Sequence, residues 1–225
     1  MKTKFTSRLT KTLRQAEGSD IPIIAGAIRE GSAPILEPYQ RQMEGVYLIE
    51  ADRQNLISST AAIYKHVRTY AKVEEILVCA ARNETVDQFN KLMAAANWEN
   101  AKRLGINAKV FPGDPVICTK NHYVSGLING MLGVVKDIQE EVLIAWDGDA
   151  LDSETGKPML RRVPSEVSMD VKLAYAITCH KSQGSSARVV VVVLEDTKLL
   201  TREWLYTAIT RARQKVIIVG TRENL

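Results

Sequence analysis

Five consecutive valines followed by a leucine, from Val189 to Leu194, constrain the fold of this chain more than any other feature. β-branched side chains favour extended backbone, and a strand that is apolar at every position has to be buried on both faces. Such strands occur in parallel sheets that helices cover on either side. The run is the longest apolar stretch of the sequence and is much too short to cross a membrane. It therefore predicts the central strand of a helix-covered parallel sheet, without a membrane partner.

Strand-like and helix-like segments alternate before and after this run, which is typical of a parallel α/β sheet. The predicted strands are residues 46–50, 76–80, 172–178, 188–194 and 215–220, and the predicted helices are residues 55–70, 83–97 and 199–211. A further helix is expected to begin at Ser19 or Asp20, to hold Pro22 in its first turn and to end at Gly31.

The pattern changes between residues 107 and 168, where short β-like runs are separated by turn-forming residues. The dipeptide Asn129-Gly130 between two apolar runs predicts a hairpin. This stretch is interpreted as a small antiparallel β-barrel inserted into the α/β domain. The chain is accordingly divided into residues 1–106, the insertion at 107–168, and residues 169–225, which complete the α/β domain.

The composition permits a nucleic-acid partner without demanding one. Lys plus Arg number 30 and Asp plus Glu number 26, a net charge of +4 that a slightly basic soluble enzyme would also have. Hydrophobic residues make up 45% and charged residues 25%, as in ordinary globular proteins.

The potential metal and disulfide ligands are scattered. The three cysteines and three histidines form no pair or cluster with metal-ligand spacing, so we expect neither a disulfide framework nor a metal site. A nuclease or other metal enzyme has little support for the same reason. No signal-peptide core is visible at the N-terminus, and a cytoplasmic location is expected.

The segment after residue 177 has the residue types of a phosphate-contacting loop. It holds Thr178, His180, Lys181, Ser182 and, beyond these, an adjacent glutamine and glycine. In open parallel sheets ligands bind at the carboxyl ends of strands, and hydroxyl and backbone amide groups contact phosphates without recognising base sequence. The alternative is a polar loop whose side chains only cap a helix. For His180 or Ser182 taken alone, that alternative is the better explanation.

Two arginines, Arg211 and Arg213, lie where a predicted helix meets the last strand. The planar fork of an arginine matches phosphate oxygens, and arginines beside a γ-phosphate stabilise charge in phosphoryl transfer. Because the two residues are two positions apart, only one can point inward. Cations are also common in the last turn of a helix, where they favour its dipole, and for the arginines taken alone this alternative is the better explanation.

Taken together, the two segments resemble a known family. The stretch TCHKSQGSS resembles motif V of the RecD/TraI-like branch of superfamily 1 DNA helicases, and YTAITRARQK resembles motif VI of the same group. Three weaker matches agree: LTKTLRQAEGSDI with the motif IV region, ILVCAARNETVDQFN with the start of the second RecA-like domain, and FPGDPVICTKNHYVSGLINGMLGVV with an SH3-like insertion. The resemblance covers nearly the whole chain, and it implies a RecA-like sheet flanked by helices with an SH3-like β-barrel inserted.

The resemblance also implies roles for individual residues. Arg211 and Arg14 would contact the γ-phosphate as the catalytic arginines, and Gln183 and Gly184 would shape the nucleotide side of the motif V loop. The residues expected near single-stranded DNA are Thr178, His180, Lys181, Ser182 and, in the insertion, Asn121 and Tyr123. A strand-end turn role is an open alternative for the last two. The family has a glutamate where this chain has Ser186, which puts one sugar contact in doubt.

A P-loop, G-x-x-x-x-G-K-[ST], is missing from the sequence, and so is an acidic Mg²⁺ motif. In the family both belong to the first RecA-like domain. We therefore expect ATP and Mg²⁺ to be bound only by a complete helicase, of 5′ to 3′ polarity by resemblance, whose P-loop-containing N-terminal domain is the partner of this chain. A fragment, a split-gene product or a truncated reading frame would each explain the sequence. The alternative is a stand-alone, non-catalytic module that binds single-stranded DNA or a partner helicase.

The purified chain by itself is predicted to hydrolyse no ATP, because the arginines can complete a nucleotide site but cannot hold Mg²⁺–ATP without a phosphate-binding loop. Phosphate release measured with and without single-stranded DNA checks this. DNA-stimulated hydrolysis that co-purifies with the chain would contradict it.

Overall fold

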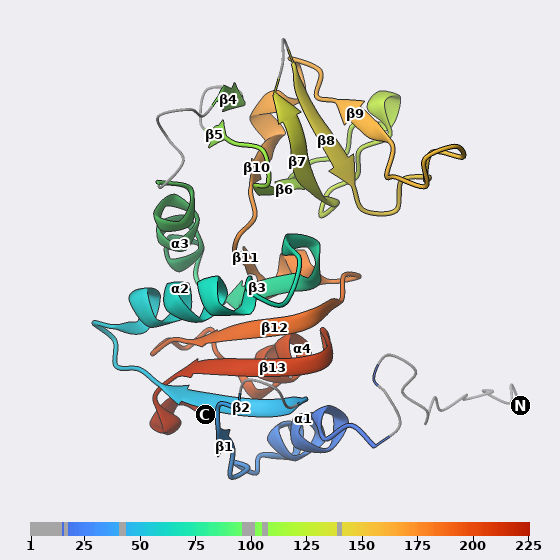
Figure 1. Ribbon diagram of the computed structural model, residues 1–225. Helices are drawn as coiled ribbons and strands as arrows, with labels where there is room; N and C mark the ends of the chain where they lie inside the picture. Colours follow the sequence, from blue (N-terminus) through green and yellow to red (C-terminus); the bar gives the residue numbers. More distant parts are fainter. Residues whose placement is uncertain (1–14, 16–17, 41–43, 96–101, 105–107, 139–140) are drawn as a thin grey trace, which may run out of the picture.

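The protein is described by a computed structural model that places residues 15, 18–40, 44–95, 102–104, 108–138 and 141–225. Figure 1 shows two sheets: a parallel sheet flanked by helices, and a smaller antiparallel sheet beyond one edge of it. The mixed α/β class and the separate antiparallel unit predicted from the sequence are thus confirmed. None of the helices in the described part of the chain is long and apolar enough to span a membrane.

The parallel sheet has six strands in the order β1-β2-β13-β12-β3-β11, and every neighbouring pair is parallel. The valine run forms β12 near the middle of the sheet, as predicted. The bounds of the strands are β1 Glu37–Pro38, β2 Gly45–Glu50, β3 Ile76–Ala80, β11 Ile177–Thr178, β12 Ala187–Leu194 and β13 Ala212–Gly220.

Side chains of β12 alternate between two apolar cores. Val190 and Val192 face a core that includes the helices α1 (Ile21–Glu30) and α4 (Arg202–Ile209). Val189, Val191 and Val193 face the other core, which includes α2 (Leu56–Val67) and α3 (Asn83–Ala95). All five valines are at most 1% exposed, so a polar side chain at any of these five positions would lose its hydration.

The first helix begins and ends at the residues the sequence predicts. Asp20 is the residue before α1, Pro22 lies in its first turn, and Gly31 follows its last residue with φ of 90°. Only glycine adopts that left-handed conformation without strain, so the helix stops there. The helix predicted over residues 199–211 is shorter: α4 spans Arg202–Ile209, and the Thr201 hydroxyl oxygen accepts the Trp204 N–H at 3.2 Å as its N-cap.

The smaller sheet is antiparallel, in the order β10-β6-β7-β8-β9, and a two-stranded ribbon of β4 and β5 precedes it. Its bounds are β4 Lys102–Leu104, β5 Ala108–Val110, β6 Pro115–Cys118, β7 Leu132–Ile138, β8 Val142–Trp146, β9 Leu160–Arg162 and β10 Val171–Leu173. Short 3-10 helices lie at η1 Val73–Glu75, η3 Tyr123–Ser125, η4 Ser168–Asp170, η5 Cys179–Ser182 and η6 Arg222–Asn224.

The predicted hairpin turn at Asn129-Gly130 differs from expectation. The strands β6 and β7 do pair, but residues 119–131 connect them, and Asn129-Gly130 ends this longer loop. A tight type I′ turn needs positive φ at both central residues, and among the described residues only glycines have it. Gly130 alone satisfies the requirement, with φ of 88°.

The strand predicted over residues 172–178 is two strands in two different sheets. β10 pairs antiparallel with β6 in the small sheet, and β11 pairs parallel with β3 in the large one. The sequence shows one continuous apolar pattern, but the connection between the strands bends the chain from one sheet to the other. β10 also lies beyond residue 168, where the sequence places the end of the insertion.

Buried hydrogen bonds hold this connection. The Asn90 side chain donates to the carbonyl oxygens of Leu173 and Ala176, each at 3.1 Å, and accepts the Ala176 N–H at 2.8 Å. The Tyr175 hydroxyl donates to the buried Asp114 carboxyl at 2.5 Å. Burial raises the pKa of Asp114, and the Tyr175 hydroxyl acts in the opposite direction.

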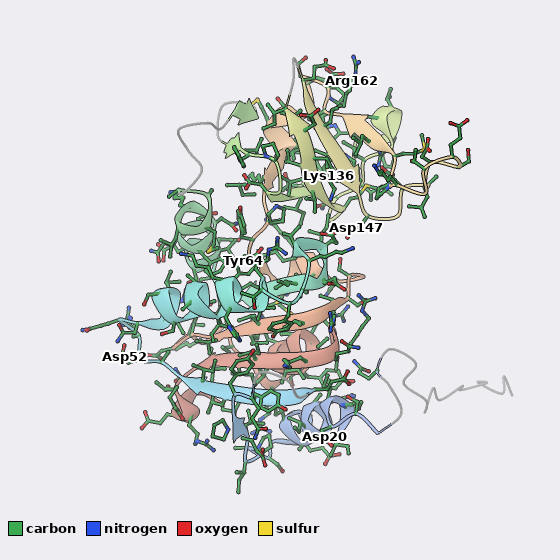
Figure 2. The ribbon with its side chains drawn as sticks, in the orientation of Figure 1. Asp20, Asp52, Tyr64, Lys136, Asp147 and Arg162 are labelled. Carbon is green, nitrogen blue, oxygen red and sulfur yellow. The ribbon has the colours of Figure 1, made fainter. Side chains whose placement is uncertain are left out.

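Aromatic packing continues this contact into the parallel sheet. Tyr64 of α2 meets the Tyr175 ring edge-on, with centroids 5.7 Å apart, and lies on the side of α2 that faces the small sheet (Figure 2). The orientation of the small sheet is thus fixed by the hydrogen bonds of Asn90 and Tyr175 and by the contact between the Tyr64 and Tyr175 rings.

Asn90→Ala is expected to lower the free energy of unfolding by about 2–4 kcal/mol, because it leaves buried backbone groups without partners. Urea denaturation followed by circular dichroism measures the change. Gln88→Ala, on an exposed position of the same helix, is the matched control and should change stability by less than about 0.5 kcal/mol. Similar losses in both variants would show that the hydrogen bonds of Asn90 make no specific contribution to the free energy of unfolding.

Candidate functional site

The motif V segment runs from the carboxyl ends of the parallel strands back to their amino ends. Thr178 is level with Ala80 at the carboxyl end of β3, whereas Ala187 is level with Ala212 at the beginning of β13. Residues 179–186 therefore run back along the sheet, on the face that carries α4. Only the start of the segment therefore lies at the carboxyl ends of the strands, where the sequence predicts a ligand site, and its end lies at their amino ends.

The turn of η5 is anchored by buried groups. The Ser182 hydroxyl is fully buried and donates to the Cys179 carbonyl at 2.7 Å, and the Cys179 thiol faces the Trp204 carbonyl at 3.7 Å. Burial raises the pKa of this thiol, so that it remains protonated. Ser182 was expected near DNA, but its hydroxyl does not reach the surface in this conformation. It stabilises the segment instead.

The neighbouring side chains face solvent. His180, Lys181, Gln183 and Gly184 are exposed, whereas Thr178 is half-buried. Gly184 has φ of 91°, which permits the sharp turn toward β12. Of the predicted DNA contacts in this segment, His180 and Lys181 are thus accessible and adjacent.

Arg211 lies at the amino edge, between α4 and β13. Its Nε donates to the Thr207 carbonyl at 3.1 Å, and its Nη1 lies 3.4 Å from the Ser185 carbonyl that it donates to. The arginine is half-buried, and Arg213 is exposed. The sequence predicts this division, in which one arginine points inward and the other remains in solvent. Ser186, which follows the arginine's partner, is exposed.

Gln15, a residue of the motif IV region, contacts the backbone beside Arg211. The Gln15 side-chain amide donates to the Ala212 carbonyl at 2.8 Å and to the Thr210 carbonyl at 3.4 Å. These are the carbonyl groups of the two residues that precede and follow Arg211. Arg14, the second predicted arginine, lies outside the described residues, but its neighbour in the chain is beside the Arg211 turn.

The predicted DNA contacts of the insertion lie in the loop between β6 and β7. Asn121 accepts the Asn129 N–H at 2.8 Å and donates to the Tyr123 hydroxyl at 3.2 Å, so it has the turn role that the sequence left open. The Tyr123 ring is 81% exposed. A Cβ placed on Gly130 would lie 3.8 Å from the Lys181 carbonyl oxygen, so this loop borders η5.

Two side chains near the start of the same loop contact the Asp170 carboxylate. Lys120 Nζ lies 2.9 Å from the Asp170 carboxylate, and His122 Nε2 lies 3.0 Å from its other oxygen. The hydrogen bond from Lys120 lowers the pKa of Asp170, with a smaller contribution from His122.

Two pockets open at the carboxyl edge of the parallel sheet. One, of about 420 Å³, includes the buried carboxylate of Glu195. This carboxylate accepts the Ala81 and Arg82 N–H groups at 2.6 and 3.1 Å and the Thr85 hydroxyl, so its oxygens are already engaged in holding the start of α3. The other, of about 350 Å³, lies between η5 and α4.

The sequence offered little to predict Gln15, the Ser185 carbonyl or the second pocket. Gln15 stands next to a predicted arginine, which was the only indication of its position. A backbone carbonyl has no side-chain pattern, and a pocket formed by segments distant in the chain has no local one either.

A guanidinium such as that of Arg211 suits phosphate oxygens. Within the described ranges, no three His, Cys, Asp or Glu side chains gather as a metal site would require.

The sequence matches the model of the UvrD-like helicase C-terminal domain over residues 173–219. The RecBCD enzyme subunit RecD of Mycolicibacterium smegmatis is 42% identical over 49% of this chain and 18% of its own length. The corresponding subunit of Buchnera aphidicola subsp. Schizaphis graminum is 25% identical over 96% of this chain and 39% of its own length. The chain thus spans less than two fifths of either relative.

The fold is similar to that of the Pif1 helicase from Bacteroides, solved with ADP-AlF3 and single-stranded DNA. The TM-score is 0.55 at 18% sequence identity, over 93% of this chain and 51% of that one. Together these comparisons confirm the predicted resemblance to the C-terminal half of superfamily 1 helicases of the RecD type.

Gln15→Ala is expected to lower the free energy of unfolding by about 1–2 kcal/mol, because two backbone carbonyls beside Arg211 lose their amide donor. Chemical denaturation measures the loss. Gln183→Ala is the matched control, since its side chain is exposed and makes no hydrogen bond to the described residues. A Gln15 variant as stable as the Gln183 variant would mean that the bridge to the Arg211 turn is not formed in solution.

Proposed function

We propose that this chain is the C-terminal motor half of an ATP-dependent DNA helicase, and that it completes a nucleotide site and grips single-stranded DNA. The observation that carries the proposal is the contact of Gln15 with the carbonyl groups of Thr210 and Ala212, the residues that precede and follow Arg211. The helicase C-terminal match includes both the motif V segment and Arg211.

On the nucleotide side, Arg211 and Arg14 are proposed to contact the γ-phosphate. Bound Mg²⁺–ATP supplies the phosphoryl group whose transfer to water drives the motor. The P-loop half of the helicase would hold the metal and the other phosphates. Arg211 is kept in position by the Thr207 and Ser185 carbonyls, so that its guanidinium has little freedom to lose on binding. Gln183 and Gly184 are proposed to shape the loop between this site and DNA.

On the DNA side, His180 and Lys181 are proposed to contact the sugar-phosphate chain, with Thr178 and Ser182 supporting them. These contacts are independent of base sequence. The loop that carries Tyr123 borders Lys181, so the insertion is proposed to guide the same strand. We further propose that the insertion is SH3-like, that its limits are residues 107–168, and that the complete helicase moves 5′ to 3′ in the cytoplasm.

The stand-alone binding module remains the competing proposal, because the sequence contains no P-loop. The two proposals differ in whether ATP matters. A motor half restores ATP hydrolysis when its partner half is supplied, whereas a binding module shows salt-dependent affinity for single strands that ATP leaves unchanged.

Mixing the chain with a separately produced P-loop half of a related helicase is expected to restore DNA-stimulated ATPase activity. Arg211→Ala should then reduce kcat about a thousandfold, because a γ-phosphate arginine stabilises charge that develops in the transition state. The exposed neighbour gives the control Arg213→Ala, which should retain activity. Full activity of the Arg211 variant would refute the arginine assignment. Single-strand binding without any restored hydrolysis would favour the binding module.

A further inference from the structure

The pocket of about 350 Å³ between η5 and the first turns of α4 is here termed the slot. Its deepest lining residues are Cys179 and Trp204, which are 2% and 8% exposed. Leu199 lines its rim and is 58% exposed, although it is a large apolar side chain. The slot thus combines an apolar floor with an apolar side chain that the fold leaves in water.

Polar and cationic side chains complete the rim. His180 and Gln183 of the motif V segment line one wall, and Lys198 lines the other. All three are exposed, and their side chains make no hydrogen bond to residues that the structure places. Lys181 is exposed beside them on η5. The Glu203 carboxylate is also exposed on the α4 side of the rim, so the positive charge is confined to the part near Lys181 and Lys198.

This distribution of polar and apolar side chains favours a base over a phosphate as the group that enters the slot. A phosphate would lose its hydration against the apolar floor, whereas a base presents a flat, weakly hydrated face. Proteins that bind single strands pair positive charge for the backbone with apolar or aromatic surfaces for the bases. The volume lies near the lower end of the range of about 300–1,000 Å³ for small-ligand pockets, which suits a single base better than a larger group.

We propose that this slot receives one unstacked nucleobase of the bound single strand, in contact with Leu199 and Trp204. The adjoining phosphates lie on the rim, near Lys181 and Lys198. This inference rests on the proposed binding of single-stranded DNA and deepens it, because it adds an apolar base contact to a surface for which only backbone contacts are otherwise proposed.

The test compares two strands on the purified chain: a short oligothymidylate and the same strand with abasic sugars throughout. Fluorescence anisotropy gives the Kd for each. Leu199→Ala is expected to weaken binding of oligothymidylate about fivefold to tenfold and to leave binding of the abasic strand unchanged. Leu199→Phe, which restores an apolar contact, should retain the affinity for oligothymidylate.

Leu151→Ala is the matched control, since this leucine is 62% exposed and lies outside the slot. It should change neither Kd. An equal loss for both strands with Leu199→Ala, or no loss for either, would overturn the base slot while leaving single-strand binding intact. Failure of the unmodified chain to bind either strand would overturn the proposed DNA contact and, with it, the slot.

Discussion

Burial of β12 on both faces is the constraint on which the other features depend. Alternate valines of this strand belong to two separate cores, so helices have to cover both sides of the sheet. The pairings of β12 with β3 and β13 then fix where its neighbours begin and end. The position of the arginine turn follows, because Ala187 pairs with Ala212 immediately after Arg211. The need to bury β12 on both faces thereby determines that Arg211 lies at the amino ends of β12 and β13.

The sequence predicted the elements of this fold better than their connections. Strand β3 has the predicted bounds, and the helix from Asp20 to Gly31 has the predicted termini, because proline and left-handed glycine are local determinants. The apolar stretch around Leu173 predicts one strand, but the structure has two, since apolar periodicity carries no information about which sheet a residue joins. The Asn129-Gly130 turn was misplaced for a related reason: a turn-forming dipeptide indicates a bend and leaves the loop length unspecified.

The candidate site was predictable as a set of segments but not as a geometry. Motif spacing identified the exposed His180 and Lys181 and the half-buried Arg211. It did not indicate that the Ser182 hydroxyl points inward to the Cys179 carbonyl. The sequence of a polar motif does not show whether a serine side chain faces solvent or the protein interior. Nor did it indicate that Gln15 reaches the Arg211 turn across almost the whole length of the chain. Such contacts depend on tertiary packing.

The short crossover from Thr178 to Ala187 brings the two proposed ligands into one structural unit. At its start lie the exposed side chains of the slot, and near its end the Ser185 carbonyl accepts a hydrogen bond from Arg211. The Ser182 hydroxyl donates to the Cys179 carbonyl, and Cys179 is packed in the core, so the turn of η5 is held against the sheet. A rigid segment with a ligand contact at each end transmits a displacement from one to the other as a movement of the whole. Coupling between a base in the slot and the arginine turn would therefore require no further element than this segment and the helix α4 on which it rests.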